Sequence, residues 1–173
     1  MGVYVEVVRN IPLLVILYLV FYTLPAFGLK LGVFMSGAIA LIVNGTAFTI
    51  EVFRGGLAAI PVGQYEAGQS LGMRSRQVLR YIVVPQWMRV TFPALGNQVV
   101  FFILGSSLVE VIGGLELTGE SYAIGSLTYR YFEAFAIAAI LYLVAVQLLL
   151  LTWTFVGGRW LAAAPTTREA GGR

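Results

Sequence analysis

Four long apolar stretches dominate the pattern of hydrophobic and polar positions along the 173-residue chain. They run over residues 11–27, 33–50, 90–112 and 135–156, and the third is interrupted by several polar side chains. A membrane-spanning helix needs about 20 predominantly apolar residues, with about 17 as the lower limit. All four stretches reach that limit, the first one barely. The pattern therefore predicts an all-α polytopic membrane protein with four transmembrane helices.

The composition agrees with a lipid environment. Of the residues, 59% are hydrophobic and 11% are charged, whereas soluble domains are about 45–50% apolar and about 25% charged. A soluble protein that used some stretches as core helices would be left with too little polar surface. The chain has no Cys and no His, so it offers no disulfide, no Cys-type metal centre and no His general base. We expect no catalytic residue, metal or cofactor, and Glu6 and Arg9 before the first stretch do not fit a cleaved signal peptide.

The basic residues predict how the chain is oriented. Lys and Arg are enriched in the short cytoplasmic loops of membrane proteins. On one side of the four stretches the only basic residues are Lys30 and Arg130, with acidic residues beside them. We therefore expect both termini and the segment between the second and third stretches to be cytoplasmic, because that side carries Arg9, Arg54, Arg74, Arg76, Arg80, Arg89, Arg159, Arg168 and Arg173.

The central segment, residues 54–89, has the signals of two short helices. Pro61 suits the first turn of a helix over Val62–Leu71, and Gly72 is the residue that best ends a helix in a left-handed conformation. Ser75 is a suitable N-cap for a second helix, which Pro85 would end or kink. Two short helices joined at a glycine turn suggest a docking element for a soluble partner, or otherwise a solvated interfacial loop.

Two of the predicted spans differ in their polar content. In the second, Gly32, Ser36, Ala40 and Asn44 recur every four residues, which favours close helix packing. In the third, polar residues inside a membrane usually face the bundle interior or a water-filled cavity, and Pro93, Gly96 and Gly105 could break the helix. The alternatives are that Asn97 and Gln98 form hydrogen bonds to neighbouring helices and that Glu110 lies at the outer headgroup level. The candidates for a substrate pathway are Asn97, Gln98, Ser106, Ser107 and Glu110.

A spaced motif runs through the central segment and the start of the third stretch. It consists of Glu66-Ala67-Gly68, Gly72 after three residues, Ile82 after nine more, and Val84-Pro85 after one more. This motif resembles the EAA loop of permease subunits of bacterial binding-protein-dependent ABC importers. The flanking runs 9–14, 51–56, 63–67 and 116–118 resemble the polar amino acid branch, which includes the histidine, glutamine, glutamate and arginine permeases. The resemblance extends from Tyr4 to about Leu161.

The resemblance implies a function and a domain organisation. Residues 1–161 would form the permease domain and residues 162–173 a cytoplasmic tail. The family usually has one further spanning helix before Tyr4, so we expect the chain to be incomplete at its N-terminus, through truncation, a misassigned start or a shortened form. Mild departures are Gly68 for Ala and Val84 for Leu, and Leu104 stands where many members have Lys. The residues that would couple to the ATPase are Gln64, Glu66, Ala67, Gly68, Gly72, Ile82 and Pro85.

The implied partners are those of an importer in a bacterial plasma (inner) membrane. They are an ABC ATPase, a second permease subunit that is identical or paralogous, a periplasmic or lipid-anchored substrate-binding protein, and membrane lipid, with no nucleic acid. The chain is not expected to be an enzyme, because its only lysine, Lys30, lacks the context of a phosphate-binding P-loop. The remaining alternatives are a permease for another small solute such as methionine, and a non-transporting assembly or scaffold subunit.

Overall fold

The computed structural model describes residues 2–161, and the expected tail, 162–173, lies outside them. Every regular element in this part of the chain is helical, as predicted. In chain order the elements are α1 (Gly2–Arg9), α2 (Leu13–Tyr18), the π-helical η1 (Leu19–Thr23), the 3-10 helix η2 (Leu24–Phe27), α3 (Val33–Ala58), α4 (Val62–Ser70), α5 (Ser75–Val78), the π-helical η3 (Leu79–Val83), α6 (Val84–Gly105), the 3-10 helix η4 (Ser106–Ile112), α7 (Leu117–Thr128) and α8 (Tyr131–Leu161).

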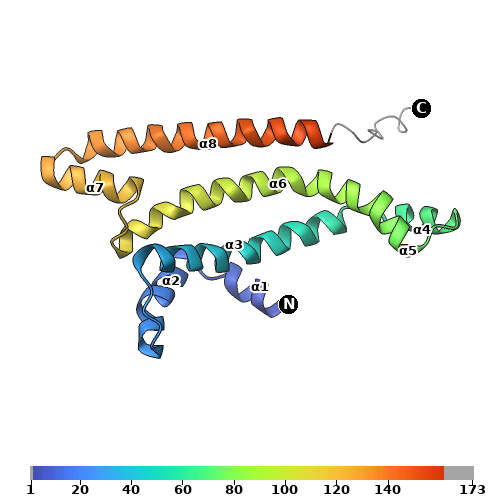
Figure 1. Ribbon diagram of the computed structural model, residues 1–173, viewed down its shortest axis with the longest axis horizontal. Helices are drawn as coiled ribbons and strands as arrows, with labels where there is room; N and C mark the ends of the chain where they lie inside the picture. The colour runs from blue at the N-terminus through green and yellow to red at the C-terminus, as the bar shows by residue number, and fades with distance from the viewer. Residues whose placement is uncertain (1, 162–173) are drawn as a thin grey trace.

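Within residues 2–161, three helices are long and apolar enough to cross a membrane. They cover Val33–Ala58, Ser75–Ile112 and Tyr131–Arg159, and they lie side by side along the long axis of the molecule (Figure 1). These helices confirm the second, third and fourth predicted spans. Each is longer than its apolar stretch, because helix formation continues into the polar residues that flank the hydrocarbon layer.

The first predicted span, residues 11–27, is helical over Leu13–Phe27 but qualifies as a membrane span only together with the preceding helix. The helical segment Leu13–Phe27 is bent by 102° relative to Gly2–Arg9, and only the two together would make a fourth, broken span. Fifteen helical residues extend about 22 Å, which is less than the roughly 30 Å of a hydrocarbon core. Pro12 explains the bend, since proline disfavours the helical conformation of the residue before it, and its own ψ of 140° is extended.

Small residues bring α3 and α6 together in an antiparallel pair. A Cβ at Gly45 would overlap the Phe102 ring, and a Cβ at Gly37 would lie 2.7 Å from Val109 Cγ2. Ser36, Ala40 and Asn44 are buried. The predicted packing stripe of the second span is therefore confirmed, except at Gly32, which is the N-cap of α3 and faces open space.

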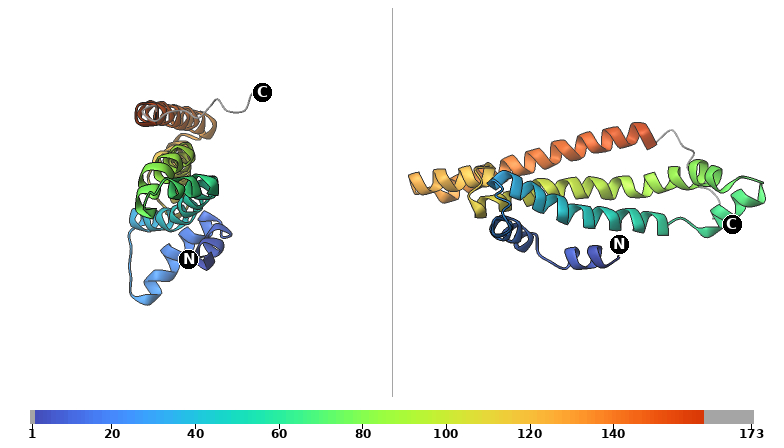
Figure 2. Two further views of the ribbon diagram at one scale, coloured as in Figure 1. Left: turned by 90° about the vertical axis from the view of Figure 1, so that its right-hand side faces the viewer. Right: turned by 60° about the horizontal axis from the view of Figure 1, so that its bottom comes forward.

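The last helix lies on the opposite side of α6 from α3, with α1 and α2 beyond α3 (Figure 2). The Trp153 indole donates to the Phe92 carbonyl oxygen at 3.0 Å, and the two rings stack with their centroids 4.6 Å apart. Gly96 leaves room for Trp153, and Gly157 leaves room for Phe92. Only 6% of the most apolar window of α8 is buried within the chain. Lipid or another helix must cover the remainder.

The two ends of the long bundle differ in charge. The α4–α5 hairpin, formed by residues 62–78, lies at one end and α7 at the other (Figure 1). Lys30 and Arg130 belong to segments at the α7 end. The hairpin end carries the described arginines of the central segment and of the last helix, which are Arg54, Arg74, Arg76, Arg80, Arg89 and Arg159.

Candidate functional site

The glycine turn of the hairpin has the predicted left-handed conformation. Gly72 has a φ of +77°. Its N–H donates to the Gln69 carbonyl oxygen at 2.9 Å, and the Met73 N–H donates to the Gly68 carbonyl oxygen at 3.2 Å. These two bonds form a Schellman motif, which satisfies carbonyl groups at the end of α4. The chain reverses sharply here because glycine has no Cβ to clash at positive φ.

The start of the second hairpin helix differs from the prediction. Ser75 is the first residue of α5, and Arg74 takes the N-cap position. The Arg74 N–H donates to the Gln77 side-chain oxygen at 2.8 Å. This bond is one half of a capping box, in which the side chain at the third helical position accepts from the backbone N–H of the N-cap residue.

Of the two alternatives expected for Pro85, that it ends the second helix or that it kinks it, the first is wrong. The helix continues from Ser75 to Ile112. The π-helical turn Leu79–Val83 comes just before the proline, and Pro85 lies in the first turn of α6. Proline is tolerated in such a turn because its missing N–H needs no partner there. The Gln86 side-chain amide donates to the Ile82 carbonyl oxygen at 3.1 Å.

The expected coupling residues separate into an inner and an outer set. Gly68 is buried, and a Cβ there would lie 2.9 Å from Val78 Cγ2 and 3.0 Å from Ile82 Cδ1. Gly68 and Ile82 therefore hold the two helices of the hairpin together. Pro85 is half-buried, whereas Gly72 is exposed at the turn and the exposed side chains of α4 include Gln64, Glu66 and Ala67.

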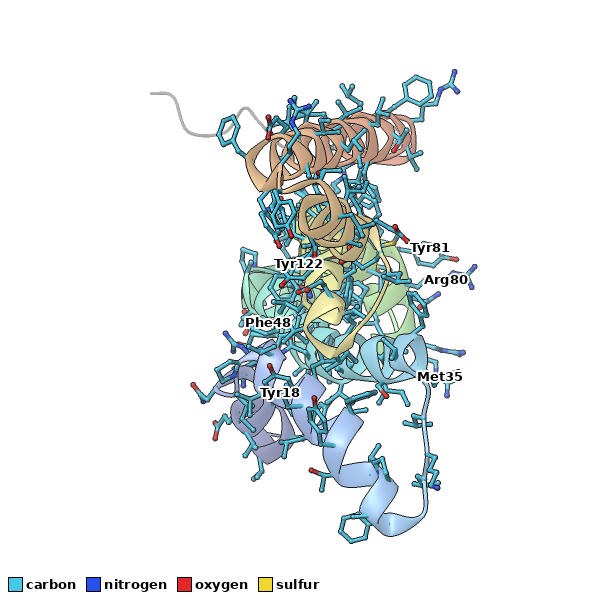
Figure 3. All side chains as sticks on the ribbon, turned by 90° about the vertical axis from the view of Figure 1, so that its left-hand side faces the viewer. Tyr18, Met35, Phe48, Arg80, Tyr81 and Tyr122 are labelled. Atoms are coloured by element: carbon cyan, nitrogen blue, oxygen red, sulfur yellow. The ribbon has the colours of Figure 1, made fainter. Side chains whose placement is uncertain are left out.

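Large apolar side chains at the hairpin are more exposed than the sequence pattern suggests. Leu71 is 81% exposed, directly before the glycine turn, and Tyr81 is 65% exposed. The Arg80 guanidinium lies 5.9 Å from the Tyr81 ring centroid, and both side chains project from the side of the molecule (Figure 3). Exposed apolar and cationic groups together are typical of a protein interaction surface. The only sequence signal for Leu71 is its place beside Gly72.

The pathway candidates on α6 do not share one surface. Asn97 is exposed, whereas Gln98 is half-buried and its Nε2 atom is buried with no hydrogen-bond partner. Pro93 and Gly96 leave the helix unbroken; only Gly105 marks a change, from α-helix to 3-10 helix. Of the three positions that could break the helix, only Gly105 therefore coincides with a change in helix type. Proline is tolerated within membrane-spanning helices because neighbouring groups satisfy the backbone groups that it leaves without a partner.

The 3-10 segment η4 places two pathway candidates, Ser107 and Glu110, on the same helix face. Side chains at i and i+3 eclipse in a 3-10 helix, so Ser107 and Glu110 lie on one face. The Ser106 hydroxyl donates to the Ile103 carbonyl oxygen at 2.7 Å, and the Ser107 hydroxyl donates to the Leu104 carbonyl oxygen at 2.6 Å. Both hydroxyl groups therefore bond to the backbone and keep their acceptor capacity.

Glu110 is half-buried beside the first turn of α7, where a Cβ at Gly119 would lie 3.6 Å from Glu110 Cγ. A second carboxylate, Glu116, caps that turn. Glu116 Oε2 accepts from the Thr118 N–H and Oε1 from the Gly119 N–H, each at 2.9 Å. The Tyr142 hydroxyl of α8 donates to Glu116 Oε2 at 2.8 Å and lies 3.0 Å from the Thr118 hydroxyl. The sequence pattern indicated only that Glu116 is an acidic loop residue.

A groove between the α1–α2 turn, α3 and α6 contains polar groups that the sequence pattern assigned to packing. Its volume is about 270 Å³, and it is lined by residues that include Arg9, Asn44, Phe48 and Phe101. Asn44 is 2% exposed, and its Oδ1 atom has no hydrogen-bond partner. Arg9 lies over the Phe48 ring and 3.3 Å from Glu51. Within residues 2–161, no cluster of three or more His, Cys, Asp or Glu could hold a metal ion.

Comparisons with known proteins agree with this architecture. Residues 1–161 match the family model described as the binding-protein-dependent transport system inner membrane component. The chain is 37% identical over 141 residues to the probable glutamine ABC transporter permease protein GlnM of Bacillus subtilis (strain 168), covering 82% of this chain and 65% of that protein. It is 36% identical over 168 residues to the octopine transport system permease protein OccM of Rhizobium meliloti, covering 92% of this chain and 65% of that protein.

The chain therefore spans about two thirds of the length of these relatives, 65% in both cases. Among solved structures, it is similar to the crystal structure of an amino acid ABC transporter with histidines. The TM-score is 0.84 at 38% sequence identity, and the match covers 91% of this chain and 74% of that chain.

Proposed function

Because the chain belongs to the family of binding-protein-dependent transport system inner membrane components, we propose that it is the permease subunit of an ATP-driven importer of polar amino acids. The observation that carries this proposal is the α4–α5 hairpin. It extends beyond the spans at the arginine-rich end and exposes Glu66 and Leu71. A surface of this kind can receive the motion of a soluble ATPase and transmit it directly into the continuous helix Ser75–Ile112.

The proposed partners follow from the exposed surfaces. An ATPase docks on the hairpin, where the glycine turn and the packed Gly68 keep α4 in a fixed position relative to the span. A second permease subunit, identical or paralogous, covers part of the exposed apolar surface of the spans, since only 6% of the most apolar window of α8 is buried within the described chain. A substrate-binding protein delivers substrate at the α7 end. The excess of arginine at the hairpin end supports a cytoplasmic location for that end.

The substrate class is supported by two kinds of similarity. The relatives described above are named for glutamine and octopine transport, and the similar solved structure is an amino acid transporter with histidines. The 3-10 segment that carries Ser107 and Glu110 provides hydroxyl and carboxylate oxygens on one face. We propose that this face contributes to the translocation path.

Purification in mild detergent tests the proposal. The membranes are solubilised, the co-purifying chains are identified, and the recovered complex is reconstituted with ATP on the hairpin side. We expect an ABC ATPase in the complex and ATP-dependent uptake of L-glutamine or L-arginine. Recovery of the chain with no ATPase under conditions that preserve other ABC complexes would contradict the proposal.

A further inference from the structure

The Glu116 carboxylate joins the start of α7 to α8. Its partner Tyr142 is 11 residues after the start of α8 at Tyr131, or about 16 Å along the helix axis. Glu116 is half-buried and is the N-cap residue of α7. Its two oxygens have partners on two different helices, so this carboxylate can fix one helix relative to the other.

The surrounding contacts compensate the charge of Glu116. Two backbone N–H groups of α7 and one tyrosine hydroxyl donate to its two oxygens. Hydrogen bonds to an ionised acceptor are about twice as strong as neutral ones, and the N-terminus of α7 adds a favourable dipole. Glu116 therefore ties α7 to α8, although the two residues that meet across this contact are 26 positions apart.

The same first turn of α7 supports the 3-10 segment. Gly119 lies directly against the Gly114 carbonyl group, leaving no room for a Cβ. A Cβ at Gly119 would also lie 3.6 Å from Glu110 Cγ. The connection is short and contains Gly113, whose φ is +85°. A displacement of the first turn of α7 would therefore displace the face that carries Ser107 and Glu110.

We propose that Glu116 is a positioning residue for translocation, which the Tyr142 hydroxyl and the first turn of α7 hold in place so that α7 supports the Ser107–Glu110 face. This inference rests on the proposed function, because it assigns the 3-10 segment to the path. A positioning role for Glu116 predicts a different result from a role in folding alone. Weakening the anchor should reduce the substrate moved per ATP hydrolysed while the complex still assembles.

The test uses the complete complex in proteoliposomes, with radiolabelled L-glutamine and, in parallel, L-arginine as probes. Tyr142→Phe removes one hydrogen bond and keeps the ring, Glu116→Gln removes the charge, and Tyr129→Phe is the matched control because Tyr129 is 88% exposed. Uptake and ATP hydrolysis are measured on the same preparations. We expect uptake to fall about tenfold in the first two variants, with assembly and ATP hydrolysis within twofold of the control.

Two results would overturn the inference. One is uptake within twofold of the control in both Tyr142→Phe and Glu116→Gln. The other is a parallel loss of uptake and assembly in Tyr142→Phe, which would indicate a folding role. If the unmodified complex moves neither amino acid, the proposed function fails instead. Hydrogen exchange of the amides at residues 117–121 then still tests the anchor: faster exchange in Tyr142→Phe than in Tyr129→Phe supports it, and equal exchange refutes it.

Discussion

The contact between α3 and α6 allows a quantitative prediction at Gly45. A methyl group at this position would overlap the Phe102 ring, whereas a methyl group at Gly55 of the same helix would meet no atom within 4 Å. Alanine gains about 0.5–1 kcal/mol over glycine in a helix interior. This gain is common to Gly45→Ala and Gly55→Ala, so it largely cancels when the two variants are compared.

The difference that remains is the cost of overpacking, which is about 1–3 kcal/mol for an extra methyl group in a well-packed contact. We therefore expect Gly45→Ala to be less stable than Gly55→Ala by about 1–3 kcal/mol. The measurement is the free energy of unfolding by titration with dodecyl sulfate in mixed micelles. Phe102→Leu removes the tip of the ring, so the double variant Gly45→Ala, Phe102→Leu should recover part of the loss. Equal stability of the two alanine variants would refute the close packing of α3 on α6.

Three further predictions concern coupling, orientation and the path. Glu66→Lys, which reverses a charge, and Gly72→Leu, which strains the left-handed turn, should each reduce ATP-driven uptake at least tenfold at normal membrane levels. Wild-type uptake in both variants would contradict the coupling role. Ser70→Cys should resist impermeant thiol reagents in intact spheroplasts while Ser126→Cys, exposed on α7, reacts, and the reverse pattern would invert the orientation. Glu110→Gln should raise the half-saturating substrate concentration or lower maximal uptake with normal assembly, and unchanged uptake of every tested amino acid would place Glu110 outside the path.

Apolar length alone is sufficient to predict three of the spans. It is not sufficient for the first stretch, where the helical segment Leu13–Phe27 qualifies as a span only together with Gly2–Arg9. The chain bends by 102° between these two segments, next to Pro12. The charge asymmetry of the loops can be read from the sequence because the enrichment of Lys and Arg in cytoplasmic loops does not depend on how the helices pack.

The conformation of the hairpin can be predicted where it depends on one residue, and it cannot where it depends on several consecutive helical turns. Only glycine adopts the positive φ at position 72 without strain, so the turn follows from one residue. The continuation of the helix past Pro85 follows a π-helical turn directly before the proline. No single residue signals that turn.

The contact between Glu116 and Tyr142 could not be predicted, because it depends on how α7 packs on α8. Similarly, the burial of Gly68 against Val78 and Ile82 depends on how closely the two helices of the hairpin approach each other. The sequence motif identifies these positions as a set but does not separate those that hold the hairpin together from those that face a partner.

Photo-crosslinking from the hairpin in intact membranes tests most directly whether the hairpin docks on an ATPase. A photoreactive amino acid is placed at position 66, with position 126 on α7 as the matched control, and the covalent adducts are identified by mass spectrometry. We predict an adduct with an ABC ATPase from position 66 and none with that ATPase from position 126. An ATPase adduct from position 126 alone, or no ATPase adduct from position 66 in cells that contain the assembled complex, would contradict the docking of the ATPase on the hairpin.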